Sequence, residues 1–200
     1  MSNEKILDAN GLTEEEFLQK YDRTQYDRPA FTVDNLLFAD CGDGLAVLMI
    51  KRGSHPDLGQ WALPGGFVKP NECAECAASR ELKEETGIEV ATEQLITVST
   101  PMRDPRGWTV STCFLGLLPE PAQPEAGDDA TEARWFNVDY IASGDVYKLI
   151  LKSDDITIAS EFKVVRNEAG KIDLNRTEIL APDGIAFDHA KIILYAVESL

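Results

Sequence analysis

Short apolar segments, separated by turns rich in glycine, proline and acidic residues, recur along most of the chain. Segments of this length that are rich in valine, isoleucine and phenylalanine are typical of β-strands. The pattern predicts core strands at residues 31–39, 45–50, 95–102, 108–118 and 133–138. The second of these is almost entirely apolar, which indicates burial on both faces, and the glycine- and proline-rich stretch after it is predicted to be a loop.

Two longer helices are predicted within the same region. Residues 73–86 form the first, which ends before Gly87, the residue type that most often follows a helix. Residues 189–200 form the second, with Asp188 as its N-terminal cap. Strands and helices that share one region of this size predict a mixed α/β fold.

A further set of strands is predicted between the core strands and the last helix, at residues 147–152, 156–165 and 171–179. Polar turns separate them, so we interpret residues 146–180 as an inserted β-meander. Residues 1–30 are predicted to be an N-terminal extension, with Thr13 and Glu16 at the spacing of a helix capping box. The remaining residues 31–200 then form one domain, and Phe17 and Leu18 of the extension offer an apolar contact.

Composition narrows the class of protein. The chain has 200 residues, which suits one domain, and a formal net charge of −16. Such a charge repels phosphate backbones, so we expect no nucleic-acid partner, although a bound cation can still attract a small anion. Residues 1–5 do not resemble a signal peptide and no apolar run is long enough to cross a bilayer. We therefore expect a cytoplasmic protein with no membrane contact.

The four cysteines include a C-x-x-C pair, Cys73 and Cys76, a spacing that zinc and redox sites share. A second pair, which a zinc site would need, is missing from the sequence. Alanines stand beside both cysteines in the predicted helix. We therefore predict that they are small buried residues without a redox role.

Candidate chemistry concentrates on the helix at residues 73–86. Glu81, Glu84 and Glu85 stand at spacings that place three carboxylates on one helical face. Crowded like charges are costly on a bare helix, but Mg²⁺ favours carboxylate oxygens. Glu72 precedes the helix, and Arg80 is suited to pairing with a neighbouring carboxylate. The alternative is a solvated charged helix face. It is disfavoured because the acidic cluster contains four glutamates but only two basic residues, Arg80 and Lys83, and because a Gly-Gly pair precedes the helix.

This stretch resembles the signature of the Nudix hydrolase family, G-x5-E-x7-R-E-U-x-E-E-x-G-U, where U is aliphatic. Every defined position is filled, by Gly66, Glu72, Arg80, Glu81, Leu82, Glu84, Glu85, Gly87 and Ile88. The resemblance implies an α/β/α sandwich around a mixed sheet and a loop–helix–loop metal site. It also implies hydrolysis of a nucleoside diphosphate derivative by a metal-activated water.

The same resemblance implies which residues do the chemistry. The metal, Mg²⁺ or Mn²⁺ as a substitute, is expected at Glu81, Glu84 and Glu85, with the Gly65 carbonyl as a frequent further ligand. Arg80 joins these glutamates as a catalytic residue. The base varies between subfamilies and can be a box glutamate or a carboxylate on a later loop.

Motifs outside the signature resemble the branch that contains ADP-ribose diphosphatases and Nudix-related regulators of NAD metabolism. They lie at residues 51–67, 103–106, 127–136 and 186–189. We expect Arg52, Arg103, Arg106 and Gly66 to contact the substrate. A turn salt bridge with Asp104 is the alternative for the two later arginines.

Several other residues of these motifs have two readings. Asp128, Asp129 and Glu132 follow a predicted loop, and Glu132, at a strand start, is the best placed of them for the metal. His55 and His189 are expected to be structural. Trp61 and Phe67 suit either the core or a platform for a nucleotide base.

The leading hypothesis is hydrolysis of ADP-ribose to AMP and ribose 5-phosphate. A sanitising pyrophosphatase for oxidised nucleoside triphosphates is the enzymatic alternative. A sensor that binds ADP-ribose or a sugar without turnover is the alternative from another class. Regulators of that kind carry a winged-helix domain and tend to have degraded signatures, so the intact signature favours an enzyme. We also expect a homodimer, with the extension or residues 146–180 at its interface, which sedimentation as a monomer would contradict.

Overall fold

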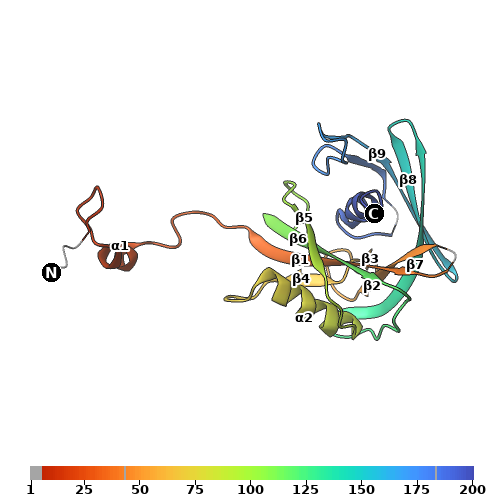
Figure 1. Ribbon diagram of the computed structural model, residues 1–200, viewed down its shortest axis with the longest axis horizontal. Helices are drawn as coiled ribbons and strands as arrows, with labels where there is room; N and C mark the ends of the chain where they lie inside the picture. Colours follow the sequence, from red (N-terminus) through yellow and green to blue (C-terminus); the bar gives the residue numbers. More distant parts are fainter. Residues whose placement is uncertain (1–5, 43, 183) are drawn as a thin grey trace.

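The computed structural model describes residues 6–42, 44–182 and 184–200 of the chain. Residues 1–5, on which the signal-peptide prediction rests, and Asp43 of a predicted turn lie outside this described part. A curved sheet forms the centre of the molecule, with α2 (Ala74–Thr86) and α3 (His189–Val197) on its opposite faces (Figure 1).

The sheet is mixed. Its spatial order is β10 (Glu178–Ala181), β9 (Ile156–Lys163), β8 (Val146–Ser153), β7 (Ala130–Ser143), β2 (Leu45–Arg52), β1 (Ala30–Asp40), β6 (Thr109–Leu118) and β5 (Glu93–Val98). β1 and β6 are parallel, and the other neighbours are antiparallel. The mixed sheet between helices confirms the predicted fold class.

The alternation of side chains explains why β1 is buried almost throughout. Leu36 and Phe38 point into the core cluster that holds α3, whereas Leu37 packs with Leu82 of α2 on the other face. Burying each large apolar side chain stabilises the fold by about 1.5–3 kcal/mol, so both helices are anchored to the same strand. The predicted two-sided burial of β2 follows the same rule, with Leu48 facing α2.

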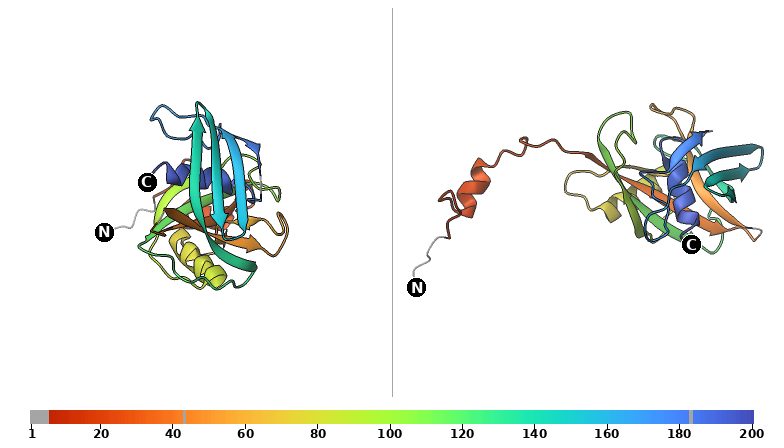
Figure 2. Two further views of the ribbon diagram at one scale, coloured as in Figure 1. Left: turned by 90° about the vertical axis from the view of Figure 1, so that its right-hand side faces the viewer. Right: turned by 90° about the horizontal axis from the view of Figure 1, so that it is seen from above.

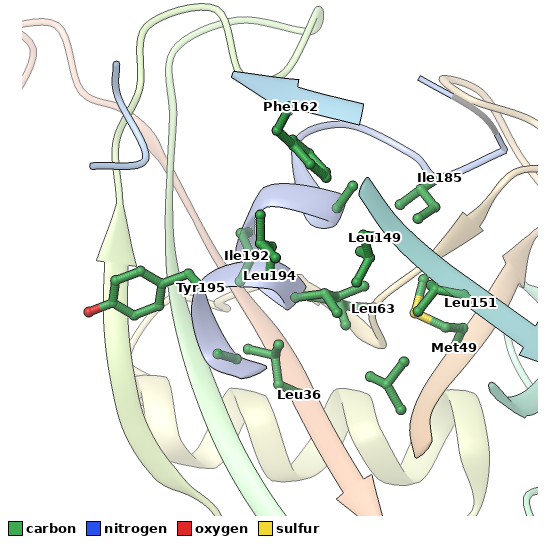
Figure 3. Packing of buried hydrophobic residues seen from close by; sticks show 14 of the residues in the cluster. Leu36, Met49, Leu63, Leu149, Leu151, Phe162, Ile185, Ile192, Leu194 and Tyr195 are labelled. Atoms are coloured by element: carbon green, nitrogen blue, oxygen red, sulfur yellow. The ribbon is translucent and has the colours of Figure 1, made fainter. Parts of the chain in front are cut away.

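The sheet curls around α3 (Figure 2). Ile192 and Leu194 of the helix pack with Leu36 of β1 and also with Leu149 and Phe162 of the later strands (Figure 3). The strands after residue 146 therefore complete the core on the α3 side of the sheet.

The loop predicted at residues 51–66 contains short strands. β2 continues to Arg52, β3 (Trp61–Ala62) pairs with β2, and β4 (Gly65–Phe67) pairs with β1. Trp61 is buried in the core against Phe136, at 4.8 Å between ring centroids. Of the two predicted roles, core packing therefore holds and the base platform does not.

Two of the three later strands lie where they were predicted, but the third does not. The predicted strand 171–179 is wrong, because β10 begins only at Glu178. Side chains divert the backbone before it: the Asn167 side chain accepts N–H bonds from Ala169 and Lys171, and Asp173 accepts from Asn175. Such local side-chain bonds compete with a strand ladder and favour turns.

The N-terminal segment projects from the body as an arm (Figures 1 and 2). It carries α1 (Glu14–Lys20), and the capping box between Thr13 and Glu16 is confirmed. None of the described residues of α1 is buried, and the Phe17 ring lies 5.7 Å from that of Tyr21, measured between centroids. A dimer interface on this arm stays a prediction.

The prediction that Cys73 and Cys76 are buried is wrong. Both are exposed and are joined by a disulfide. Cys73 is the N-cap of α2, and its sulfur accepts the Cys76 N–H at 3.1 Å. Ala74, Ala77 and Ala78 pack toward Val33 and Phe114 of the sheet, whereas the two cysteines are exposed to solvent.

None of the helices in the described part of the chain has the length and apolar character that crossing a bilayer requires.

Candidate active site

The backbone of β4 passes unusually close to its neighbours. A Cβ atom at Gly65 would lie 2.1 Å from the Val33 carbonyl oxygen, and one at Gly66 would lie 2.6 Å from the Glu81 carboxyl carbon. Neither position can hold a larger residue without a shift, because real Cβ contacts are longer. The glycine pair therefore lets the Glu81 carboxylate of α2 lie directly over the β4 backbone.

Glu85, one helical turn after Glu81, is buried on the same side of α2, with 6% of its surface exposed. Its carboxylate accepts the Gly65 N–H at 2.8 Å. Burial raises the pKa of Glu85 to about 8, and the nearby charges of Glu81 and Asp128 add to the rise. Burial also raises the pKa of Glu81, although Arg80 opposes it. Both carboxylates thus lie where a negative charge is costly unless a cation joins them.

Arg80 organises the outer side of this helix. It binds Glu72 through two hydrogen bonds, Nε to Oε1 at 2.8 Å and Nη2 to Oε2 at 2.9 Å. Its Nη1 donates to Glu81 at 2.6 Å and to Glu84 at 3.0 Å. Hydrogen bonds from Arg80 lower the pKa of Glu72 to about 2. Glu72 therefore positions Arg80, which in turn fixes the Glu81 carboxylate.

A cavity of about 300 Å³ opens beside these groups. Its acidic wall combines Glu81 and Glu85 with Asp128 and Asp129 of the loop before β7. Backbone hydrogen bonds hold that loop against α2, including one from the Gly127 N–H to the Glu85 carbonyl at 3.2 Å. Two carboxylates from a helix and two from a loop therefore meet across one cavity.

Another part of the cavity wall is basic and aromatic. The Arg52 guanidinium stacks on Phe187 at 4.9 Å from the ring centroid, and its Nε donates to the Pro56 carbonyl. The Arg106 guanidinium lies 5.0 Å from the centroid of Phe67 and 5.7 Å from that of Phe187. Burial lowers the pKa of Arg52, and the charge of Arg106 lowers it further, so this wall favours an anion.

Arg106 is held in place by a carboxylate. Asp104 accepts hydrogen bonds from its Nε and Nη2, the latter at 2.7 Å, so the salt bridge foreseen as the alternative is present. The side chain is nevertheless 43% exposed and lines the cavity. Arg106 can therefore contact a ligand while Asp104 holds it.

Arg103 differs from Arg106, although both line the cavity. Only 5% of the Arg103 side chain is exposed, and it donates to Asp188 at 2.8 and 3.1 Å. Its Nη2 also lies 3.5 Å from Asp34. Asp188 was predicted to cap α3, but its carboxylate is bound by Arg103 instead and makes no cap bond within the described helix. Arg103 thus joins two buried carboxylates beneath the cavity.

Two further side chains complete this buried network. Ser111 donates to the Asp34 Oδ2 atom at 2.6 Å. His189 accepts the Leu63 N–H through Nδ1 at 3.0 Å, so its proton is on Nε2, which lies 3.5 Å from the Asp34 Oδ1 atom. Burial lowers the pKa of His189, which keeps the ring neutral. The expected structural role of His189 agrees with these contacts.

The structure brings most of the predicted site residues together. The cavity wall contains Gly65, Gly66, Glu81, Glu85, Arg52, Arg103 and Arg106. Glu84 is on the Arg80 side of α2. Glu132 is paired with Lys51 and Arg134, each at 2.8 Å, outside the lining residues. Among the described residues, no three carboxylate, histidine or cysteine side chains already surround one metal position.

Asp34 and Phe187 were given no role from the sequence. Asp34 stands in a strand that is buried almost throughout, and an acid at such a position is itself a signal of a buried polar network. Phe187 belongs to the motif at residues 186–189, but its backbone conformation is visible only in the structure.

The raised pKa of Glu85 predicts how stability depends on pH without metal. Its ordinary pKa is 4.5, so between pH 4.5 and about 8 the folded chain holds a proton that the unfolded chain has lost. This stabilisation is complete below pH 4.5 and is lost as pH rises through 8, by on the order of 4 kcal/mol. Urea unfolding in EDTA between pH 5 and 9 should show the decline. Glu85→Gln should flatten it, and equal slopes for both proteins would contradict the assignment.

This chain is similar to known proteins. The NUDIX domain model matches residues 28–153. The chain is 32% identical to the ADPR responsive transcriptional repressor NtrR of Acinetobacter baylyi over 136 residues, which are 66% of this chain and 54% of that protein. It is 43% identical to an ADP-ribose pyrophosphatase of Methanocaldococcus jannaschii over 122 residues, 60% of this chain and 68% of that protein.

A solved structure resembles the whole fold. It is the NUDIX domain of Shewanella oneidensis NrtR complexed with ADP ribose, with a TM-score of 0.66 and 28% identity over 94% of this chain and 99% of that one. The chain spans about half the length of the Acinetobacter repressor, so that match concerns this domain. With the family model covering more than half of its residues, the chain belongs to the NUDIX domain family.

Proposed function

We propose that this protein hydrolyses the diphosphate bridge of ADP-ribose to AMP and ribose 5-phosphate, with Mg²⁺ as its metal. One observation carries the proposal. Two buried carboxylates, Glu81 and Glu85, line the same cavity as the guanidinium groups of Arg52 and Arg106. A metal-bound diphosphate would suit this lining, because its oxygens could meet both the cation and the guanidinium groups.

The residues present suit a hard divalent cation. Carboxylate oxygens are the ligands that Mg²⁺ favours, and a cation would offset the charge that burial makes costly at Glu85. We assign Glu81 and Glu85 as its principal side-chain ligands, with the Gly65 carbonyl as a further ligand. Asp128 or Asp129, which line the cavity, replace Glu132 as the proposed further carboxylate ligand of the metal. When bound, the metal lowers the pKa of a water and neutralises charge on the diphosphate.

The chain's own residues supply binding and positioning. Arg80 holds the Glu81 carboxylate, and Arg52 and Arg106 are placed to bind phosphate oxygens. The loop carboxylates Asp128 and Asp129 are candidates for accepting the proton of the attacking water. Arg103, bound to Asp188 and Asp34, stabilises the floor of the cavity.

A second candidate is ADP-ribose binding without turnover. The similarity to a transcriptional repressor and to the ADP-ribose complex of a regulator's NUDIX domain favours it. Turnover separates the two candidates, because both require binding.

Steady-state hydrolysis measured on a substrate panel tests the proposal. With Mg²⁺ we expect ADP-ribose to be cleaved with a higher kcat/KM than oxidised nucleoside triphosphates, and EDTA should abolish cleavage. Clear cleavage of a triphosphate but not of ADP-ribose would replace the proposal with the sanitising function. Saturable ADP-ribose binding without products would favour the sensor.

A further inference from the structure

Phe187 has a backbone conformation that bulky residues rarely adopt. Its φ is 53°, in the left-handed region where a Cβ atom is strained. Residues kept in such conformations concentrate at functional sites, where the surrounding structure holds them. The strain therefore raises the question of what the Phe187 ring does.

The surrounding contacts fix this conformation firmly. The Phe187 N–H donates to the Asp57 carboxylate at 3.1 Å. Trp61 accepts the Ala186 N–H at 2.8 Å and donates its own N–H to the Gly184 carbonyl at 2.8 Å. The segment is thus bonded to β3 and presents the Phe187 ring at the cavity wall as a rigid surface.

The ring already holds flat groups. The Arg52 guanidinium stacks on it at 4.9 Å, and that of Arg106 approaches at 5.7 Å while also contacting Phe67 at 5.0 Å. Phe67 is 47% exposed and lines the same cavity. Arg106 is the more exposed of the two arginines, although Asp104 holds it. Its planar head shows that a flat group can lie beside both aromatic rings.

Packing alone does not account for these features. Phe187 does contact a small apolar cluster around Ile50 and Ala62. The ring also lies 5.3 Å from the His189 ring, measured between centroids. A branched aliphatic residue could make the apolar contact, but it would not give the guanidinium groups a ring to stack on.

We propose that Phe187 is a specificity-determining residue whose ring stacks against the purine base of the substrate, with Phe67 beside it. The inference rests on the proposed function, because it names the part of ADP-ribose that the basic and aromatic wall recognises. Base–aromatic stacking is favourable for every base, so the ring selects a nucleotide over a sugar phosphate.

Ligand binding to the Phe187→Leu variant tests this assignment. We expect its Kd for AMP, measured by calorimetry with Mg²⁺, and its KM for ADP-ribose to rise about tenfold. The Ki of ribose 5-phosphate should stay within twofold of the wild-type value, because that ligand has no base. Phe187→Tyr should restore AMP binding. An unchanged AMP affinity, or an equal loss for ribose 5-phosphate, would overturn the assignment.

A pair of variants separates the ring from the backbone. Phe187→Gly and Phe187→Ala both remove the ring and should lose AMP affinity equally. The glycine variant should melt at the higher temperature, because glycine tolerates the positive φ. If AMP affinity followed melting temperature instead, a merely structural role would replace the proposal.

The result also stays distinct from the proposed function. AMP binding needs no turnover, so a protein that binds AMP through Phe187 but leaves ADP-ribose intact would contradict only the hydrolase. Normal hydrolysis together with unchanged AMP binding by Phe187→Leu would contradict only this inference. A wild-type protein that binds no AMP would also contradict the inference that Phe187 stacks on the base.

Discussion

Replacing Glu85 with glutamine is expected to lower kcat for ADP-ribose about a thousandfold. The amide keeps the shape of the carboxyl group and can still accept the Gly65 N–H, which is now 2.8 Å from Oε2. It lacks the charge that holds a divalent cation at the buried end of the cavity. Loss of a group that acts on charge in the transition state commonly lowers the rate by two to three orders of magnitude. Initial rates at saturating ADP-ribose and Mg²⁺ measure the effect.

Controls separate the loss of charge from a loss of folding. Burial makes the Glu85 charge costly, so Glu85→Gln should melt no lower than the wild type at pH 8 without metal. Glu84→Gln, at a partly exposed residue bound to Arg80, should lower kcat less. Glu89→Gln, at an exposed residue paired with Lys83, is the matched surface control. A folded Glu85→Gln protein with more than a tenth of wild-type activity would contradict the role of Glu85.

Arg103→Ala is expected to lower the free energy of unfolding by about 3–5 kcal/mol. Removing this buried cation leaves the carboxylates of Asp34 and Asp188 together, which share it now at 3.5 and 2.8 Å. An uncompensated buried charge costs more than a surface charge, because water cannot solvate it. For a chain of this size the melting temperature should fall by roughly 10 °C, which calorimetry would detect.

Arg106→Ala is the matched control, since the two arginines stand three residues apart and line one cavity. Arg106 is 43% exposed and leaves one carboxylate, Asp104, rather than two without a cation, so stability should fall less than for Arg103→Ala. The KM for ADP-ribose should rise instead. Equal melting temperatures for Arg103→Ala and the wild type would show that the buried network is not structural.

The fold was predictable where one pattern determined the outcome. The apolar run of β2 and the helix between Cys73 and Gly87 lie close to the predicted positions, because periodicity and a glycine terminator agree there. The third late strand was missed because Asn167 and Asp173 bind nearby backbone N–H groups. The exposed disulfide was missed because the alanines that predicted burial face the sheet while the cysteines do not.

The site was predictable to the extent that it lies on one helix. Spacing alone predicted Glu81, Glu84 and Glu85 on one face, but only Glu81 and Glu85 line the cavity, whereas Glu84 is bound to Arg80. Sequence spacing could not show that Arg103 turns inward while Arg106 faces the cavity. Nor could it show that Glu132 pairs with Lys51, or that residue 187 adopts a left-handed backbone. These features depend on contacts between segments far apart in sequence.

Calorimetric titration of Mg²⁺ into the protein in the presence of AMP tests most directly whether the buried carboxylates form a metal site. Saturable binding to the wild type is expected, with at least a tenfold weaker Kd for Glu85→Gln. Equal Mg²⁺ affinity in the two proteins, or no uptake by the wild type, would contradict this account.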